Sequence, residues 1–275
     1  MVDEAIQAKG TTRVTRGLSW ALAALMAVQS AVGILVPSAY RDVLWIRTAW
    51  LGTDVVTLFV VVPLLVWGLL ASRRGSTRGE LLWFGALGYG VYNNAYYMLG
   101  AALNRAFPLY VALFIGCLWT LLLALAGTDV GETAARFAER TPVRVVAGYM
   151  AFTGVGLAIA WLAQWAVFAF GGVTPSIGEG PFRLVASLDL SLIVPAMLVG
   201  AVLLWRRRPW GLILAAIANI LGAVYTLGLT AASAFGAARG IAGSAAQVPV
   251  WGVWTLVGVA ATAALLWRVA PSPAE

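Results

Sequence analysis

The chain has 275 residues, of which 61% are hydrophobic and only 11% are charged, with a formal net charge of +7. A soluble domain carries about 25% charged residues, so this composition excludes a water-soluble globular protein and predicts a polytopic membrane protein. Histidine is absent and cysteine occurs once, which excludes His-ligated haem, His/Cys zinc sites, histidine-based catalysis and intramolecular disulfides.

Weakly charged runs of about 20 residues recur along the chain, and this length matches the hydrocarbon core of a bilayer. No stretch shows the ten-residue alternation of a barrel strand, so the predicted fold is an all-α integral membrane protein. The first run, LSWALAALMAVQSAVGILV, is longer than a signal-peptide core and is predicted to be a span. We predict eight transmembrane helices, near 17–36, 50–72, 80–103, 107–126, 144–170, 184–205, 209–235 and 248–268.

The longest polar stretch, residues 128–143, lies between the fourth and fifth predicted spans. Acidic residues come first and basic residues last, as the dipole of a helix favours. Glu132 and Arg136 are four residues apart and form a supportive pair on a helix. We predict a short amphipathic connector at the cytoplasmic surface, with a docking site for a partner protein as the alternative.

Basic residues predict the orientation of the spans, because cytoplasmic loops are enriched in Lys and Arg. One set of predicted helix ends carries 13 of the 18 Lys and Arg residues. The other set carries the remaining five, which are Arg41, Arg47, Arg105, Arg183 and Arg239. Both termini are therefore predicted to be cytoplasmic, with the basic face against anionic lipid headgroups rather than nucleic acid.

Polar residues inside the spans recur at matched spacings. Gln29 and Asp54 are 25 residues apart, and so are Gln164 and Asp189. A proline follows each aspartate, and Pro63 and Pro195 each precede an arginine cluster. We predict two parallel four-span repeats, 1–127 and 144–275, joined by the connector 128–143. Chance similarity between apolar helices is the alternative.

The third predicted span contains YGVYNNAYYMLG. At about 100° per residue, its tyrosines and Asn93 fall on one face, and only Asn94 lies outside that arc. Lipid cannot pair with these groups, so the face is predicted to look into the bundle or a wet cavity. Two interpretations remain open for this face, namely hydrogen bonding between helices or the lining of a site for a small molecule.

Asp54 and Asp189 are the only acids inside apolar runs. An ionisable residue within a span indicates a functional site. The neighbouring Thr53 and Ser187 equally suggest helix N-caps at the outer interface, and pairing with Arg105 or Arg183 is a third alternative. Lone Cys117 is predicted to be a small apolar filler.

The blocks WFGALGYGVYNNAYYMLGAALNRAFPLYVALF and LDLSLIVPAMLVGAVLLWRRRPWG resemble a pattern that recurs in an uncharacterised family of bacterial polytopic inner-membrane proteins. The resemblance covers most of the chain. It implies a multi-pass protein of the bacterial cytoplasmic membrane and brings no activity, catalytic residue or cofactor.

The leading functional hypothesis is a small transporter or solute-binding membrane protein with a pathway between the two repeats. A small organic or cationic ligand is expected, with coupling to protons or a cation. A non-catalytic scaffold or accessory subunit is the alternative, a lipid-modifying enzyme comes third, and we expect no enzymatic activity, cofactor, metal or nucleic-acid partner. The residues predicted to line the site are Asp54, Asp189, Gln29, Gln164, Tyr89, Tyr92, Asn93, Tyr96 and Tyr97.

Overall fold

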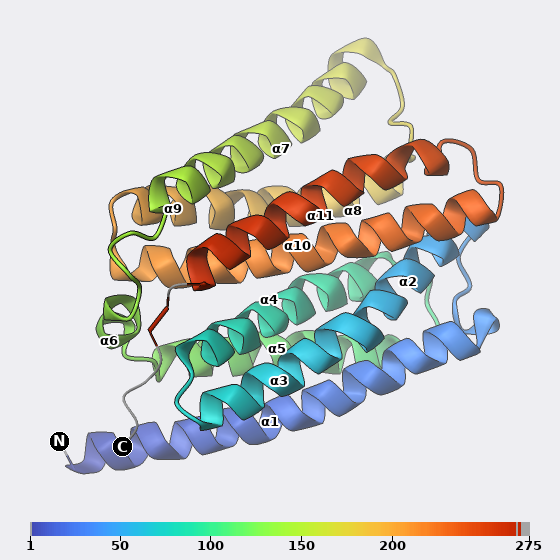
Figure 1. Ribbon diagram of the computed structural model, residues 1–275. Helices are drawn as coiled ribbons and strands as arrows, with labels where there is room; N and C mark the ends of the chain where they lie inside the picture. Colours follow the sequence, from blue (N-terminus) through green and yellow to red (C-terminus); the bar gives the residue numbers. More distant parts are fainter. Residues whose placement is uncertain (1, 268, 271–275) are drawn as a thin grey trace.

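The computed structural model describes residues 2–267, 269 and 270, with side chains from residue 13 onward except Pro37. Long helices lie side by side and form a single bundle (Figure 1). The helices are α1 Val2–Leu35, α2 Leu44–Val56, α3 Val62–Arg73, α4 Thr77–Gly100, α5 Phe107–Ala126, α6 Val130–Ala135, α7 Val143–Gly171, α8 Glu179–Leu188, α9 Val194–Trp205, α10 Pro209–Ala238 and α11 Ser244–Leu266. Shorter elements are the 3-10 turn η1 Pro37–Ala39 and the π-helical turns η2 Thr57–Val61 and η3 Asp189–Ile193.

Seven helical segments in the described part of the chain are long and apolar enough to cross a membrane. They are 13–35, 44–73, 107–126, 143–171, 179–205, 209–238 and 244–266. The protein is therefore a multi-pass helical membrane protein in contact with lipid. The predicted span at 80–103 falls on α4, which is not among the seven because its tyrosines and asparagines lower its hydropathy. The count of eight spans stays a prediction.

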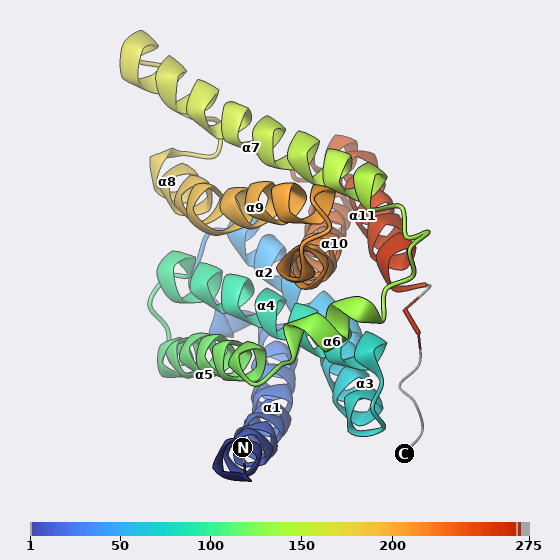
Figure 2. The same ribbon diagram turned by 90° about the vertical axis from the view of Figure 1, so that its left-hand side faces the viewer.

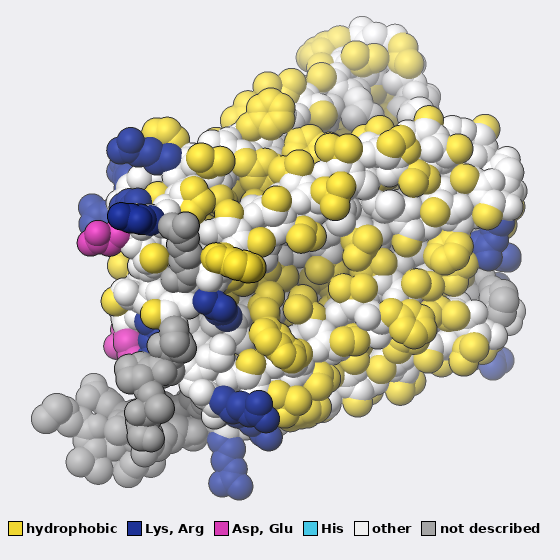
Figure 3. Space-filling view, viewed as in Figure 1, with side chains coloured by type: hydrophobic (Ala, Val, Ile, Leu, Met, Phe, Trp, Pro, Cys, Tyr) yellow, Lys and Arg dark blue, Asp and Glu magenta, His cyan; other side chains and the backbone are white. Residues whose placement is uncertain are grey.

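The helix ends gather at two ends of the bundle (Figure 1). We call the end with loops 36–43, 101–106, 172–178 and 239–243 the distal end, and the end with loops 74–76, 127–142 and 206–208 the proximal end. Lys and Arg side chains gather at these two ends, and the surface between them is mostly apolar (Figure 3). This arrangement suits a bilayer around the middle of the bundle, and the predicted orientation of the two ends stays a prediction.

The centre of the bundle is built from α4 and α10. The apolar segment of α10 is 61% buried, against 17–39% for the other six spanning segments. Helix α4 contacts α10 and also packs on α3, α5 and α8. The tyrosine-rich helix is therefore an internal helix with little access to lipid, although we expected one apolar face of it to suit lipid. Leu87 on that face is fully buried.

Helix α7 departs most from a compact bundle. Its distal half extends away from α11 in both views (Figures 1 and 2). Phe170 near its end is 83% exposed, and α7 packs mainly on α9. In the first half of the chain the corresponding helices α1 and α5 pack against each other.

The connector contains the short helix α6. Asp129 caps it by accepting a hydrogen bond from the Glu132 amide at 2.9 Å, and Glu132 forms an ion pair with Arg136. Arg136 also donates to Thr77 Oγ1 at 2.9 Å, which fastens the connector to the start of α4. The predicted domain boundaries stay a prediction.

Candidate functional site

Asp54 lies at the centre of a buried hydrogen-bonded cluster. Its side chain is 0% exposed, and it accepts from Tyr40 Oη at 2.6 Å and from Tyr97 Oη at 2.9 Å. Burial, and next the Asp54 carboxylate, raise the pKa of the Tyr40 phenol well above its ordinary value. Tyr40 therefore keeps its proton and donates to Asp54 at any pH at which the protein is studied.

Helix α1 approaches this carboxylate closely through Gly33. A Cβ added to Gly33 would lie 1.9 Å from Asp54 Oδ2 and 2.6 Å from Tyr40 Oη. No side chain fits there, so glycine is required for α1 to pack against the Asp54–Tyr40 pair.

Asp189 has a related environment in the second half of the chain. It is 4% exposed and accepts from Tyr92 Oη at 2.6 Å and from Trp161 Nε1 at 2.8 Å. The ring of Tyr92 packs edge-on against Tyr225 of α10, with ring centroids 4.8 Å apart. Asp189 is thus held by α4 on one side and α7 on the other.

One helix therefore supplies donors to both aspartates, since Tyr92 and Tyr97 both belong to α4. The prediction that the tyrosine face looks into the bundle is confirmed, because Tyr89, Tyr92, Tyr97 and Asn93 are at most 2% exposed. Tyr89 Oη lies 3.0 Å from Thr57 Oγ1. Tyr96 is partly buried and packs against Trp50. Asn94 is also buried, although the helical arc placed it outside this face.

The aspartates are not helix caps, and this corrects the alternative drawn from Thr53 and Ser187. Helix α2 begins at Leu44 and α8 at Glu179, so both aspartates lie well inside helical backbone. Neither lies at an outer mouth, since both are buried. In the described part of the chain neither forms an ion pair with Arg105 or Arg183, because tyrosine and tryptophan donors occupy the carboxylates.

Both aspartate-bearing helices contain a π-helical turn just before the proline. The amide of Val62 donates to Thr57 O, and the amide of Val194 donates to Asp189 O, in each case five residues back. Proline lacks an amide proton and clashes with the preceding turn, and a widened turn accommodates it. The two π turns are offset by the same 132 residues as Pro63 and Pro195. In that register Asp189 corresponds to Thr57, one turn after Asp54.

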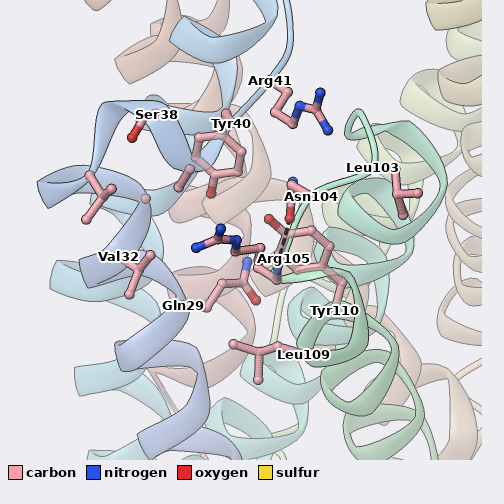
Figure 4. A pocket seen from close by; sticks show the side chains of 14 residues that line it. Gln29, Val32, Ser38, Tyr40, Arg41, Leu103, Asn104, Arg105, Leu109 and Tyr110 are labelled. Carbon is pink, nitrogen blue, oxygen red and sulfur yellow. Dashed lines mark hydrogen bonds between the residues drawn. The ribbon is translucent and has the colours of Figure 1, made fainter.

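A cavity of about 870 Å³ opens at the distal end between α1, η1, the α4–α5 loop and α5 (Figure 4). This volume is in the range of small-molecule sites. Its polar lining includes Gln29, Tyr40, Arg41, Asn104, Arg105 and Tyr110, and its apolar lining includes Val32, Val36, Leu103 and Leu109. Through Tyr40 the cavity wall is hydrogen-bonded directly to Asp54.

Comparison of the chain with protein-family models, curated proteins and solved structures found no match. The multi-pass helical architecture therefore stands on this structure alone. The resemblance to a bacterial family stays a prediction.

The predicted site residues do not converge on one pathway between the halves. Gln29 lines the distal cavity, and Asp54 is linked to it through Tyr40. Asp189 and Tyr92 form their own cluster beside α7. Gln164 is exposed on the distal half of α7 and bonds only to Ala160 of its own helix among the described contacts.

Four polar cavity residues beyond the predicted set come from the distal loops and from α5: Arg41, Asn104, Arg105 and Tyr110. The sequence held one signal for the two arginines, because both belong to the five basic residues on the arginine-poor side. Among the described residues no group of three His, Cys, Asp or Glu side chains is placed to hold a metal ion.

Proposed function

We propose that the protein is a small-solute transporter of the bacterial cytoplasmic membrane, and that its solute binds in the distal cavity. The observation that carries the proposal is the cavity itself, with polar groups converging from α1, η1 and the α4–α5 loop on an amphipathic space. Gln29 is 5% exposed, and its Oε1 has no hydrogen-bond partner in the described structure. A buried acceptor without a donor is rare, so an occupant of the cavity that donates to it is supported.

Asp54 is the residue to which we assign coupling. A solute in the cavity touches Tyr40, and Tyr40 donates to Asp54 at 2.6 Å. An intramembrane carboxylate next to a ligand site is a common location for a coupling proton. The proposal gives no residue a catalytic role.

The path inward from the cavity would require α2 and α3 to move against α4. The π turn at Thr57–Val61 and Pro63 interrupt the regular hydrogen bonding of that helix at mid-length. Interrupted helices serve as sites of movement in many transporters. The related turn at Asp189–Ile193 supports a matching movement in the second half.

The proposal is tested by reconstituting the purified protein into liposomes and measuring uptake of labelled solutes with and without an inward proton gradient. The panel should include organic acids, amino acids, sugars and amines, and protein-free liposomes are the control. We expect uptake of one class of solute, accelerated by the gradient, and loss of this acceleration in Asp54→Asn. Uptake equal to that of protein-free liposomes for every class would refute a transport function.

A non-catalytic accessory subunit is the second candidate, and helix α7 is the observation that favours it. Its distal half is exposed and presents Gln164, a polar side chain at membrane depth, outside the bundle. Polar side chains facing lipid are costly and are usually satisfied by another helix. This candidate predicts that a partner protein co-purifies from native membranes and is lost in Gln164→Leu.

A further inference from the structure

The charge of the distal cavity is one-sided. Arg41 and Arg105 line it, and no Asp or Glu is among its lining residues. In the described part of the chain neither arginine forms an ion pair or a side-chain hydrogen bond. Arginine stays charged in proteins, so the cavity contains two positive charges without a protein counter-charge.

The nearest carboxylates do not supply that counter-charge, because other donors occupy them. Asp42 accepts from Trp50 Nε1 at 3.1 Å and from the amide of Ala102 at 2.9 Å. Asp54 accepts from Tyr40 and Tyr97. Uncharged donors thus hold both acids on the protein side of the cavity wall, and the guanidinium groups are left for an occupant.

The third polar feature is the amide of Gln29. In Figure 4 the guanidinium of Arg105 extends from the α4–α5 loop toward Gln29 and Tyr40. The buried Gln29 Oε1 lacks a donor. A positive group and an unpartnered acceptor therefore face the same space, which an oxyanion with an additional N–H or O–H donor would satisfy.

We propose that the distal cavity binds an organic oxyanion, a carboxylate or a phosphate, that also carries a hydroxyl or amino donor and a short apolar part. Arg105 and Arg41 bind the oxyanion, Gln29 accepts from the donor, and Val32 and Leu109 contact the apolar part. This inference rests on the proposed function and narrows its solute class from the cationic ligands that the aspartates suggested. The headgroup of an anionic lipid offers the same chemistry as a free organic acid.

The test is a titration of the purified full-length protein in neutral detergent, followed by calorimetry and thermal unfolding. The probes are 3-hydroxybutyrate, its neutral amide, butyrate, choline and dihexanoyl-phosphatidylglycerol. We expect 3-hydroxybutyrate or the phosphatidylglycerol to bind and to raise the unfolding midpoint. Butyrate should bind more weakly than 3-hydroxybutyrate because it lacks the donor, and the amide and choline should not bind.

Arg105→Gln should weaken binding of the oxyanion roughly tenfold or more, since a charge-assisted contact is lost. Arg105→Lys should retain part of the affinity. Arg183→Gln is the matched control, because Arg183 is an exposed arginine at the same end of the bundle but outside the cavity. Exposed Arg105 is replaceable without loss of folding, which the unfolding midpoint of each unliganded variant verifies.

The outcomes separate the two possible sources of the anion and the two proposals. Binding of the phosphatidylglycerol alone, weakened by Arg105→Gln, supports the oxyanion site and assigns its occupant to the lipid. Equal binding of the neutral amide or of choline would overturn the oxyanion inference while leaving solute transport intact. Undiminished binding in folded Arg105→Gln, or no binding by any probe, would also overturn it, and the uptake panel judges the transport function independently.

Discussion

At the scale of single residues, the two aspartates are defined by their donors. Each carboxylate is buried and accepts one tyrosine hydroxyl from α4, Tyr97 for Asp54 and Tyr92 for Asp189. Each has a second donor from a different element, namely Tyr40 before α2 and Trp161 of α7. An intramembrane carboxylate is costly unless it is paired, so these hydrogen bonds explain how both acids are tolerated in the bundle.

Tyr97→Phe removes one of the two donors to Asp54 and leaves a buried oxygen without it. We expect a loss of about 1–3 kcal/mol in the free energy of unfolding, measured by denaturant titration in detergent. In a double-mutant cycle with Asp54→Asn, the two substitutions should couple. Tyr89→Phe is the control, because Tyr89 is bonded to Thr57 and its loss should couple with Asp54→Asn much more weakly. Simple additivity of Tyr97→Phe and Asp54→Asn would contradict the assigned contact.

The sequence was informative about which residues are unusual but not about their partners. Polar and aromatic spacing predicted an inward face on the third span, and the burial of Tyr89, Tyr92 and Tyr97 confirms it. The cap interpretation of Asp54 was wrong because α2 extends back to Leu44, through Arg47, which had been placed outside the span. Partners such as Tyr40 and Trp161 are set by tertiary packing, which local spacing does not report.

At the scale of elements, α4 is the link between the two halves and α7 is the least anchored helix. The distal half of α7 is tied to the bundle by Trp161, which donates to Asp189 and packs edge-on against Phe182 at 5.5 Å. Beyond it, Trp165 contacts only Phe170 among the aromatic pairs described. The orientation of this segment therefore depends on a single side chain.

Trp161→Phe should release the distal half of α7. We expect a broader distribution of distances between spin labels at Phe170 and Val250, measured by pulsed electron paramagnetic resonance in nanodiscs. Trp165→Phe is the matched control and should leave the distribution unchanged, because Trp165 is half exposed and bonds to no acid. A distribution equally narrow in both variants would show that Trp161 does not anchor α7.

Helix positions were predictable to within a few residues, because charge-free runs of spanning length identify them without tertiary information. The predicted span at 144–170 corresponds to α7 at Val143–Gly171. The π turns were not predicted, since Pro63 and Pro195 signal an interruption but not its geometry. The common offset of 132 residues favours the predicted duplication, which stays a prediction.

At the scale of the whole molecule, the charge distribution predicts the direction of insertion. The proximal end carries most of the arginines and is expected to be cytoplasmic. The distal cavity would then open toward the outside, where a solute arrives. The directions of the cavity and of transport both depend on this orientation.

Cysteine labelling of intact cells tests the orientation. Cys117 is buried and is first replaced by Ala, and single cysteines are then placed at Ser38 in the distal loop and at Glu139 in the proximal loop. A membrane-impermeant thiol reagent should label Ser38→Cys in intact cells and Glu139→Cys only after permeabilisation. The reverse pattern would place the cavity on the cytoplasmic side.

The most direct test of a solute path through the distal cavity is to fill that cavity and measure uptake. Leu109 lines the cavity, and Leu122 of the same helix is 46% exposed and lies outside it. We predict that Leu109→Trp abolishes liposome uptake of the panel solute that wild-type protein carries fastest, and that Leu122→Trp retains it. Uptake at the wild-type rate in folded Leu109→Trp would contradict the assignment of the cavity as the solute site.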